Sequence, residues 1–170
     1  KDAKPEVTSE VALSIGELLG AIQDEQEALL RDLIAKTPDR LADEKANYYF
    51  MLGELFAKQH RHHRLKSVEL TIAADATKDP KARAEATKRT DLAQRKLAQA
   101  LGIYKELTEN TAFRNFPKMD MALFYYGYSL KSGRYMDRAR DVFDVLLKNS
   151  PNSRYAPEAH LVFADYFFER

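Results

Sequence analysis

The sequence predicts an all-α protein, and three observations lead to this fold class. Alanine, leucine, glutamate, lysine and arginine, all good helix formers, dominate the 170 residues. Glycine and proline occur only six times each, and we expect both to lie between periodic segments rather than inside them. Runs of β-branched residues and the Asn-Gly or Asp-Gly pairs typical of β-hairpins are absent from the sequence.

The first two helices follow from apolar periodicity. In residues 9–36 apolar residues recur at steps of three and four and line one face of a helix: Val11, Ile15, Leu18, Leu19, Ile22, Leu29, Leu30 and Leu33. Thr37-Pro38-Asp39 ends this helix and begins the next, because proline is tolerated in a first helical turn. The second helix is expected to continue to about residue 78, with a thinner apolar stripe of Leu65, Val68 and Ile72.

The remaining helices follow from caps and loops. Asp79-Pro80 is a good N-cap and first-turn pair, so a third helix is expected from there to about Glu109. The loop NTAFRNFPK then leads into the fourth, and the last three helices are expected at about 119–131, 135–148 and 156–170. The sequence therefore predicts antiparallel helix pairs joined by short turns, with an unusually long and polar stretch at 58–90.

Charge and residue types narrow the function. The chain has 27 basic and 26 acidic residues and a net charge of +1, whereas a nucleic-acid-binding domain is usually strongly basic. It has no cysteine, which excludes disulfides and thiolate metal sites, and no run of about 18 apolar residues that would span a membrane. Because it opens on KDAKPEVTSE, we expect either a removed signal peptide or an excised fragment.

The helix pairs carry an internal repeat. YYFMLGELF at 48–56 and LFYYGYSL at 123–130 place a bulky residue directly before a glycine, and HLVFADYFF at 160–168 has Phe-Ala at the same points. AQALGIYKEL and RARDVFDVLL each place an alanine four residues before an aromatic residue. We expect the small residues to let a facing helix approach closely: Gly53, Gly127, Ala164, Ala100 and Ala139. Tyr104 and Phe143 then fill the space between neighbouring pairs.

This order of residues resembles the tetratricopeptide repeat (TPR), which has a period of about 34 residues. The pattern AxxxFxxLLxxxPxSxYAPEA at 139–159 is similar to bacterial envelope TPR proteins of the Tol-Pal-associated and outer-membrane-assembly lipoprotein types. The stretch 116–169 further resembles gliding-motility TPR proteins of myxobacteria. The sequence departs from the pattern in the early turn glycine, Gly133, and in the polar insertion of the first repeat.

The resemblance implies an α-solenoid of antiparallel helix pairs, in which stacking buries a shared core. We expect one TPR-like domain over 1–170, made of an N-terminal helix (1–38), an extended first repeat (39–116), a second repeat (117–153) and the first helix of a truncated third repeat (154–170).

The resemblance also implies a partner-binding groove, because the first helix of each TPR pair lines the concave surface. The groove residues expected are Phe50, Glu54, Lys58, Phe124, Tyr128, Lys131, Leu161, Asp165 and Phe168. Tyrosine and phenylalanine suit such a site because they bury a large area at low entropy cost. The alternative is that these aromatic residues pack against a neighbouring helix.

The segment KQHRHHRLK at 58–66 is the one conspicuous chemical cluster. His60 and His63 share a helix face, but two imidazoles without a third ligand in so basic a segment make a weak metal site. We therefore expect no metal or other cofactor. Arg61, Arg64 and Lys66 are candidates for contact with phosphate or an acidic surface, although basic positions all round the helix favour a solvated extension.

The sequence contains no nucleophile elbow, HExxH motif, phosphate-binding glycine loop or dinucleotide fingerprint, so we expect a protein that is not an enzyme. The resemblance implies a protein–protein interaction scaffold of the periplasm or outer membrane. Its partner would be another envelope protein of a gliding-motility or envelope-assembly complex. A self-association module is one alternative. A binder of anionic surfaces or nucleic acid through 58–66 is another.

Overall fold

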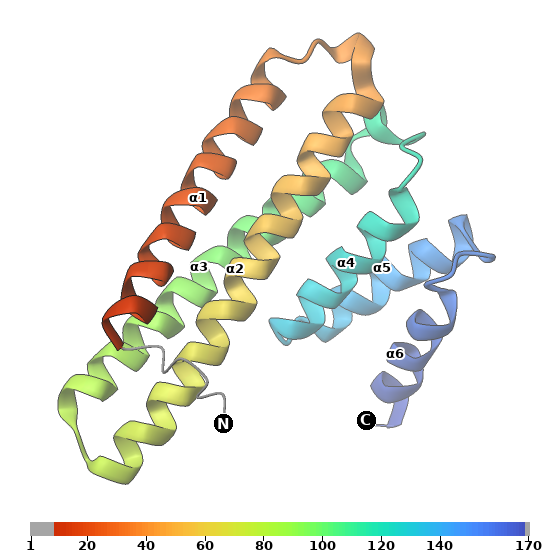
Figure 1. The fold of residues 1–170 in the computed structure, drawn as a ribbon. Helices are drawn as coiled ribbons and strands as arrows, with labels where there is room; N and C mark the ends of the chain where they lie inside the picture. The colour runs from red at the N-terminus through yellow and green to blue at the C-terminus, as the bar shows by residue number, and fades with distance from the viewer. Residues whose placement is uncertain (1–8, 169–170) are drawn as a thin grey trace, which may run out of the picture.

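The computed structural model describes the backbone of residues 9–168 and, within that range, every side chain except those of residues 9–13, 165, 167 and 168. These residues form six α-helices and no strand, which confirms the all-α prediction (Figure 1). The helices are α1 (Ser9–Lys36), α2 (Ala42–Thr77), α3 (Pro80–Glu109), α4 (Met119–Ser132), α5 (Met136–Asn149) and α6 (Ala156–Phe168), with short 3-10 helices at Asp39–Leu41 and Thr111–Phe113.

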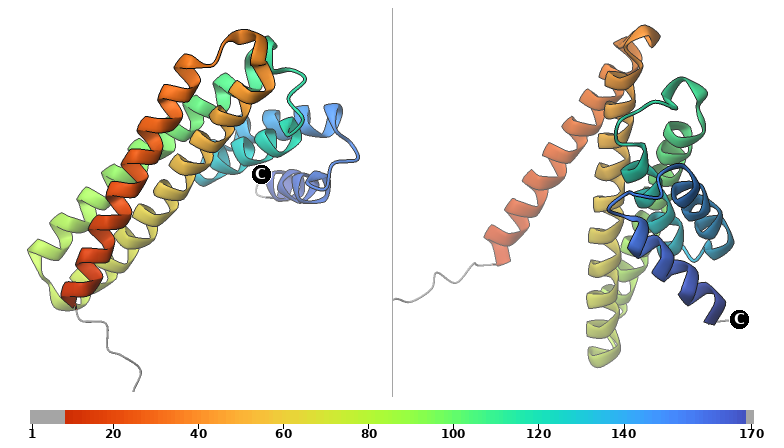
Figure 2. Two further views of the ribbon diagram at one scale, coloured as in Figure 1. Left: turned by 45° about the horizontal axis from the view of Figure 1, so that its top comes forward. Right: turned by 90° about the vertical axis from the view of Figure 1, so that its right-hand side faces the viewer.

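A long antiparallel hairpin of α2 and α3 is the frame of the molecule. At 36 residues, α2 is about 54 Å long, whereas the 14-residue α4 and α5 are about 21 Å each. α1 lies along one side of the hairpin, α4 and α5 form a short hairpin on another side, and α6 follows α5 (Figures 1 and 2). The far half of the α2/α3 hairpin therefore projects beyond α4 and α5.

The turn between α2 and α3 has the chemistry that the sequence predicts. Lys78 ends α2 in the left-handed conformation, with a φ of 55°. The Asp79 side chain then accepts a hydrogen bond from the backbone N–H of Lys81 at 2.9 Å, and Pro80 occupies the first helical turn. The polar stretch 58–90 is thus a regular, elongated helical hairpin rather than a loop.

At two glycines, an aromatic ring of the facing helix occupies the space of a side chain. A Cβ placed on Gly53 of α2 would lie 2.7 Å from the Tyr104 ring of α3, and one on Gly127 of α4 would lie 2.6 Å from the Phe143 ring of α5. The expectation that glycines lie between helices is wrong, because five of the six lie within α1–α4. At Gly53 and Gly127 the reason is physical, since a ring occupies the volume of a side chain.

The core is continuous through the two hairpins. Its largest side chains with less than 2% exposure are Tyr104, Phe56, Phe143, Leu52, Leu107, Leu130 and Leu146. Ala100 and Ala139, predicted as small contact positions, are fully buried. Ala164 differs from the two glycines because it is exposed, and α6 buries Val162 and Tyr166 instead.

α1 packs through a face other than its most apolar one. Leu30 and Ile34 join the core. Nearer the N-terminus the contacts are polar, because Gln59 of α2 donates to Gln23 at 3.2 Å and Lys96 of α3 pairs with Glu27 at 3.4 Å. Most of the predicted stripe is left in solvent, with exposures of 44–62% at Ile15, Leu18, Leu19, Ile22 and Leu29. Towards its N-terminal end α1 leans away from α2 (Figure 2).

The glycine contacts predict opposite outcomes for two similar substitutions. Gly127→Ala should lower the free energy of unfolding by about 1–3 kcal/mol, because its Cβ would overlap the Phe143 ring. Gly102→Ala, also within a helix but with nothing within 4 Å of the added Cβ, should raise it by about 0.5–1 kcal/mol through helix propensity. Urea unfolding followed by circular dichroism measures both. Equal stabilisation by the two substitutions would contradict the close approach.

Candidate functional site

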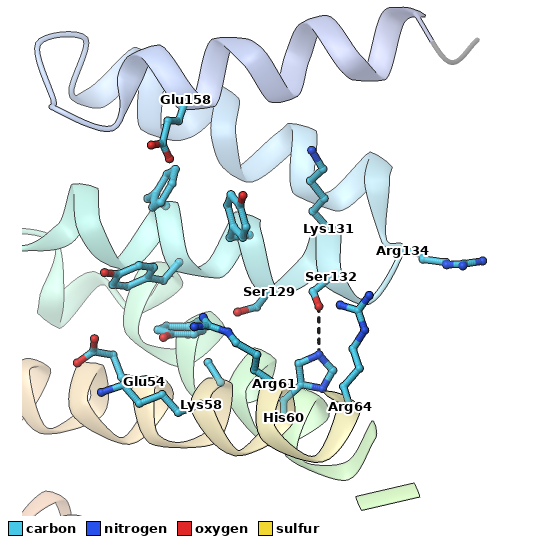
Figure 3. Close-up of a pocket in the computed structure, with 15 residues that line it drawn as sticks. Glu54, Lys58, His60, Arg61, Arg64, Ser129, Lys131, Ser132, Arg134 and Glu158 are labelled. Carbon is cyan, nitrogen blue, oxygen red and sulfur yellow. Dashed lines mark hydrogen bonds between the residues drawn. The ribbon is translucent and has the colours of Figure 1, made fainter. Parts of the chain in front are cut away.

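A cavity of about 840 Å³ lies between α2 and α4, with α6 on its far side (Figure 3). It falls on the side of α2 that faces the short hairpin. The lining residues come from four helices and one turn: Glu54, Ala57, Lys58, His60, Arg61, Arg64, Tyr104, Phe124, Tyr125, Tyr128, Ser129, Lys131, Ser132, Arg134 and Glu158.

The apolar part of the cavity consists of aromatic rings that pack on further aromatic rings beneath the cavity surface. Phe124 stacks on Tyr155 at 4.6 Å between ring centroids and lies 6.1 Å from Phe143. Tyr128 rests on Phe124 at 5.5 Å and is 52% exposed. Phe124 is 6% exposed, so it packs behind the cavity surface, whereas the Tyr128 ring is available to a ligand.

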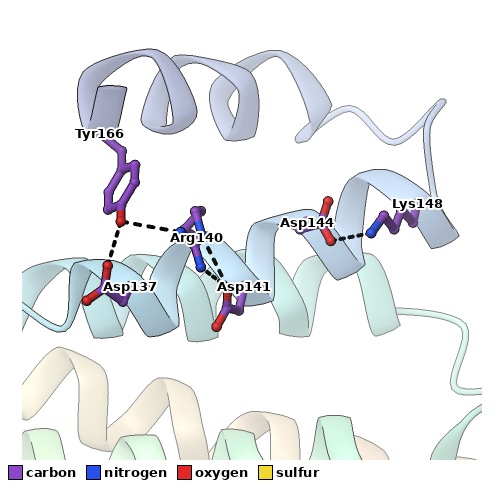
Figure 4. Close-up of polar contacts among 6 residues, drawn as sticks. All are labelled: Asp137, Arg140, Asp141, Asp144, Lys148 and Tyr166. Atoms are coloured by element: carbon purple, nitrogen blue, oxygen red, sulfur yellow. Dashed lines mark hydrogen bonds and ion pairs between the residues drawn. The ribbon is translucent and has the colours of Figure 1, made fainter. Parts of the chain in front are cut away.

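α6 is held in place by polar contacts with α5. The Tyr166 hydroxyl donates to Asp137 at 2.6 Å and accepts from Arg140 at 3.3 Å (Figure 4). In the turn before α6, Ser153 donates to Asp120 of α4 at 2.6 Å. These contacts bring Glu158 over the cavity.

Charge is unevenly distributed around the cavity. Five cations line it, against the two carboxylates Glu54 and Glu158. In Figure 3 the carboxylates lie towards one end, whereas Arg64, Lys131 and Arg134 lie towards the other. Cations thus outnumber carboxylates in the cavity of a chain whose net charge is only +1.

At the basic end of the cavity, His60 of α2 forms hydrogen bonds with both α3 and α4. Its Nδ1 lies 2.8 Å from the carbonyl oxygen of Ala93 in α3, and its Nε2 lies 3.1 Å from the hydroxyl of Ser132 in α4. The residue is 9% exposed. Since Ser132 is the last residue of α4, this hydrogen bond fixes where α4 ends against α2.

His63 lies in a different environment. Its Nδ1 is 3.4 Å from an Arg89 guanidinium nitrogen. Burial, followed by the nearby His62, Arg89 and Lys96, lowers the pKa of His63. His60 and His63 thus have separate partners, and the described residues contain no group of three or more His, Cys, Asp or Glu that could hold a metal ion.

Two tyrosines of the cavity, Tyr104 and Tyr125, are held in the protonated form by their surroundings. Burial raises the pKa of Tyr104, with a smaller contribution from Glu54, and burial likewise raises the pKa of Tyr125. Their phenol groups therefore offer hydroxyls rather than phenolates, so they add no negative charge to the cavity.

The structure brings together five of the nine predicted groove residues: Glu54, Lys58, Phe124, Tyr128 and Lys131. Phe50 lies apart from them, in the core, with 4% exposure and its ring stacked on Tyr125. Leu161 is 65% exposed but does not line the cavity. The side chains of Asp165 and Phe168 lie outside the described residues.

The predicted groove includes Lys131 but not Arg61, Arg64 or Arg134. Arg61 continues the face of Glu54 and Lys58 at a helical step. The sequence indicates Arg61 and Arg64 only as candidates for contact with phosphate or an acidic surface, with a solvated helix extension favoured, and does not join them to the groove. Arg134 and Glu158 gave no signal, since their positions depend on how the turn and α6 fold back.

Comparison with known proteins gives no identification. No protein-family model, curated protein or solved structure matches this chain. No helix in the described part of the chain is long and apolar enough to cross a membrane. The function is therefore argued from the cavity and the faces around it.

The His60 contacts predict a stability difference between neighbouring histidines. His60→Ala should lower the free energy of unfolding by about 1–3 kcal/mol, because it leaves buried partners unsatisfied on two helices. His62→Ala, at an exposed position two residues away, should change it by less than about 0.5 kcal/mol. Thermal and urea unfolding measure both, and equal effects would exclude a special role for His60.

Proposed function

We propose that this chain is a non-catalytic protein–protein interaction scaffold that holds a segment of another protein in the cavity between α2, α4 and α6. From the resemblance to envelope TPR proteins, we place it in the periplasm or at the outer membrane, in a gliding-motility or envelope-assembly complex. The partner is then another envelope protein.

The observation that carries the proposal is the exposed Tyr128 on a rigid aromatic support. Its ring is half exposed inside a cavity, and Phe124, Tyr155 and Phe143 hold the rings beneath it. An aromatic residue that is already ordered loses little entropy when a partner covers it. Such a residue, surrounded by charged groups, has the composition of a binding hot spot.

The two hairpins support the TPR-like assignment within this proposal. In each, a glycine of the first helix faces an aromatic ring of the second, Gly53 with Tyr104 and Gly127 with Phe143. The glycines are 74 residues apart, about twice the TPR period. Tyr126 of the second hairpin lies 6.3 Å from Tyr104 of the first, so the hairpins share one seam, as stacked repeats do.

The polar groups of the cavity favour binding over catalysis. His60 and Ser132 have the spacing of a base and a nucleophile. However, Ser132 is in the last turn of α4, where the negative end of the helix dipole disfavours a developing oxyanion. We therefore assign this pair to holding the helices together.

Self-association is a second candidate function, and α1 favours it. Ile15, Leu18 and Ile22 form an exposed apolar stripe on the part of the helix that leans away from α2. Packing against the same stripe of another copy would remove these side chains from water.

The scaffold proposal predicts that partner capture depends on the cavity. Tyr128→Ala combined with Lys58→Ala should lose the proteins that the wild-type chain captures from an envelope extract of its source. The measurement is quantitative mass spectrometry of the captured proteins. Val145→Ala combined with Lys88→Ala changes exposed residues outside the cavity and should leave capture unchanged.

Identical recovery by the cavity variant and the wild type would contradict the proposal. For the second candidate, sedimentation at increasing concentration is decisive. A chain that stays monomeric would count against self-association, whereas a dimer abolished by Leu18→Asp would support it.

A further inference from the structure

We infer that the segment held by this protein is an acidic amphipathic helix, with acidic residues at the basic end of the cavity and its apolar face on an exposed stripe of α2. This inference rests on the proposed function, because it names the chemistry of the partner at the same site. Three sets of contacts carry it.

The stripe continues the cavity. Arg61, Leu65, Val68 and Ile72 follow one another at steps of four, three and four residues, so they lie on one face of α2. Arg61 lines the cavity, and the three apolar residues beyond it are 60%, 51% and 66% exposed. The face of α2 that carries Arg61 thus continues into the half of the hairpin that projects beyond α4 and α5 in Figure 1.

The hairpin does not use this stripe to hold itself together. In the projecting half of the hairpin, beyond His60, the buried residues of α2 and α3 are small: Ser67, Ala74, Ala86 and Ala93. The Ser67 hydroxyl is 2.5 Å from that of Thr90 in α3, which places Ser67 on the inner face. Leu65, Val68 and Ile72 point away from that face, and α4 ends at the His60–Ser132 hydrogen bond before it reaches them.

Three of the cations that line the cavity are Arg61, Arg64 and Arg134. Within the described residues, no carboxylate pairs with Arg61, Arg64 or Arg134. Arginines that keep their charge uncompensated beside an aromatic wall complement carboxylates, to which they donate in a bidentate geometry. The occupant is therefore acidic where it meets these three side chains.

The form of the occupant follows from the surface that receives it. Helices line the cavity and the stripe, so no sheet edge is there to hydrogen-bond an extended peptide backbone. A helix satisfies its own backbone groups and can place side chains at i, i+3 and i+7 along the matching spacing of α2. A helix of about 20 residues, roughly 30 Å long, would reach from the cavity to Ile72.

The experiment is selection from a displayed library of random peptides of about 20 residues, with the full chain as target. The selected peptides should carry clustered Asp or Glu beside apolar residues at helical spacing, and should gain helix on binding. Arg61→Glu with Arg64→Glu, and separately Leu65→Asp with Ile72→Asp, should each weaken binding of the best peptide about tenfold or more.

Matched controls separate this site from general charge and hydrophobicity. Arg95→Glu with Arg114→Glu lowers the net charge by the same amount at exposed positions elsewhere. Met51→Asp with Val145→Asp changes two exposed apolar residues outside the cavity. Neither pair should change affinity more than about twofold. Unfolding curves confirm that every variant is folded.

Four outcomes would overturn the inference. Neutral or basic peptides that bind and are lost with Tyr128→Ala would leave the scaffold function standing but remove the acidic helix. Acidic peptides unaffected by the Leu65 and Ile72 changes would remove the stripe. A DNA duplex bound more tightly than any peptide at about 150 mM salt would assign the cations to phosphate. No peptide bound at the cavity would contradict both this inference and the proposed function.

Discussion

Two aromatic rings seated on two glycines determine how closely the helices approach, and the remaining architecture depends on that spacing. Tyr104 fills the position of a side chain at Gly53, and Phe143 does so at Gly127. Each ring is buried between the two helices of its hairpin, and it also contacts the next element. Tyr104 meets Tyr126 of α4, and Phe143 meets Phe124 beside Tyr155. The seam is thus a row of rings that links the two hairpins to the turn before α6.

The unequal lengths of the two hairpins create the functional surface. If α4 were as long as α2, it would cover the face that carries Leu65, Val68 and Ile72. Instead α4 ends at Ser132, opposite His60, and the turn beyond it brings Arg134 near Arg61 and Arg64 at the cavity. Arg134 adopts a φ of 64°, in the left-handed region, while the preceding Gly133 does not. A Cβ on Gly133 would lie 2.7 Å from the Tyr135 ring and 2.9 Å from a methyl carbon of Leu97, so the absence of a side chain here leaves room for both residues.

Local signals in the sequence were sufficient to predict the helices. The Asp79-Pro80 cap, the break at Thr37-Pro38 and the loop before Met119 each act within a few residues of themselves, and the structure has helix ends there. The pairing of glycines with aromatic residues could also be predicted from the sequence, because it repeats. The face through which α1 packs could not be predicted. Its apolar stripe is exposed, and its contacts use Gln23 and Glu27, whose partners Gln59 and Lys96 are 36 and 69 residues away.

The candidate site was predictable where it lies on one helix face and not where it joins several elements. Glu54 and Lys58, like Phe124 and Tyr128, are each one helical turn apart. Arg64, Arg134 and Glu158 come together only because α4 ends where it does and α6 folds back. Phe50 shows that periodicity alone can mislead. Its spacing from Glu54 and Lys58 fits the groove, but the Tyr125 ring covers it and it lies in the core.

A double-mutant cycle between Gly53→Ala and Tyr104→Leu tests most directly whether the contact between ring and glycine sets the spacing of α2 and α3. If the ring occupies the volume above Gly53, the added methyl group should be costly beside tyrosine and much less costly beside leucine. The coupling energy from urea unfolding should then be about 1–2 kcal/mol. Additive effects, with a coupling below about 0.5 kcal/mol, would mean that the two residues do not meet as described and would contradict the close approach of α2 and α3.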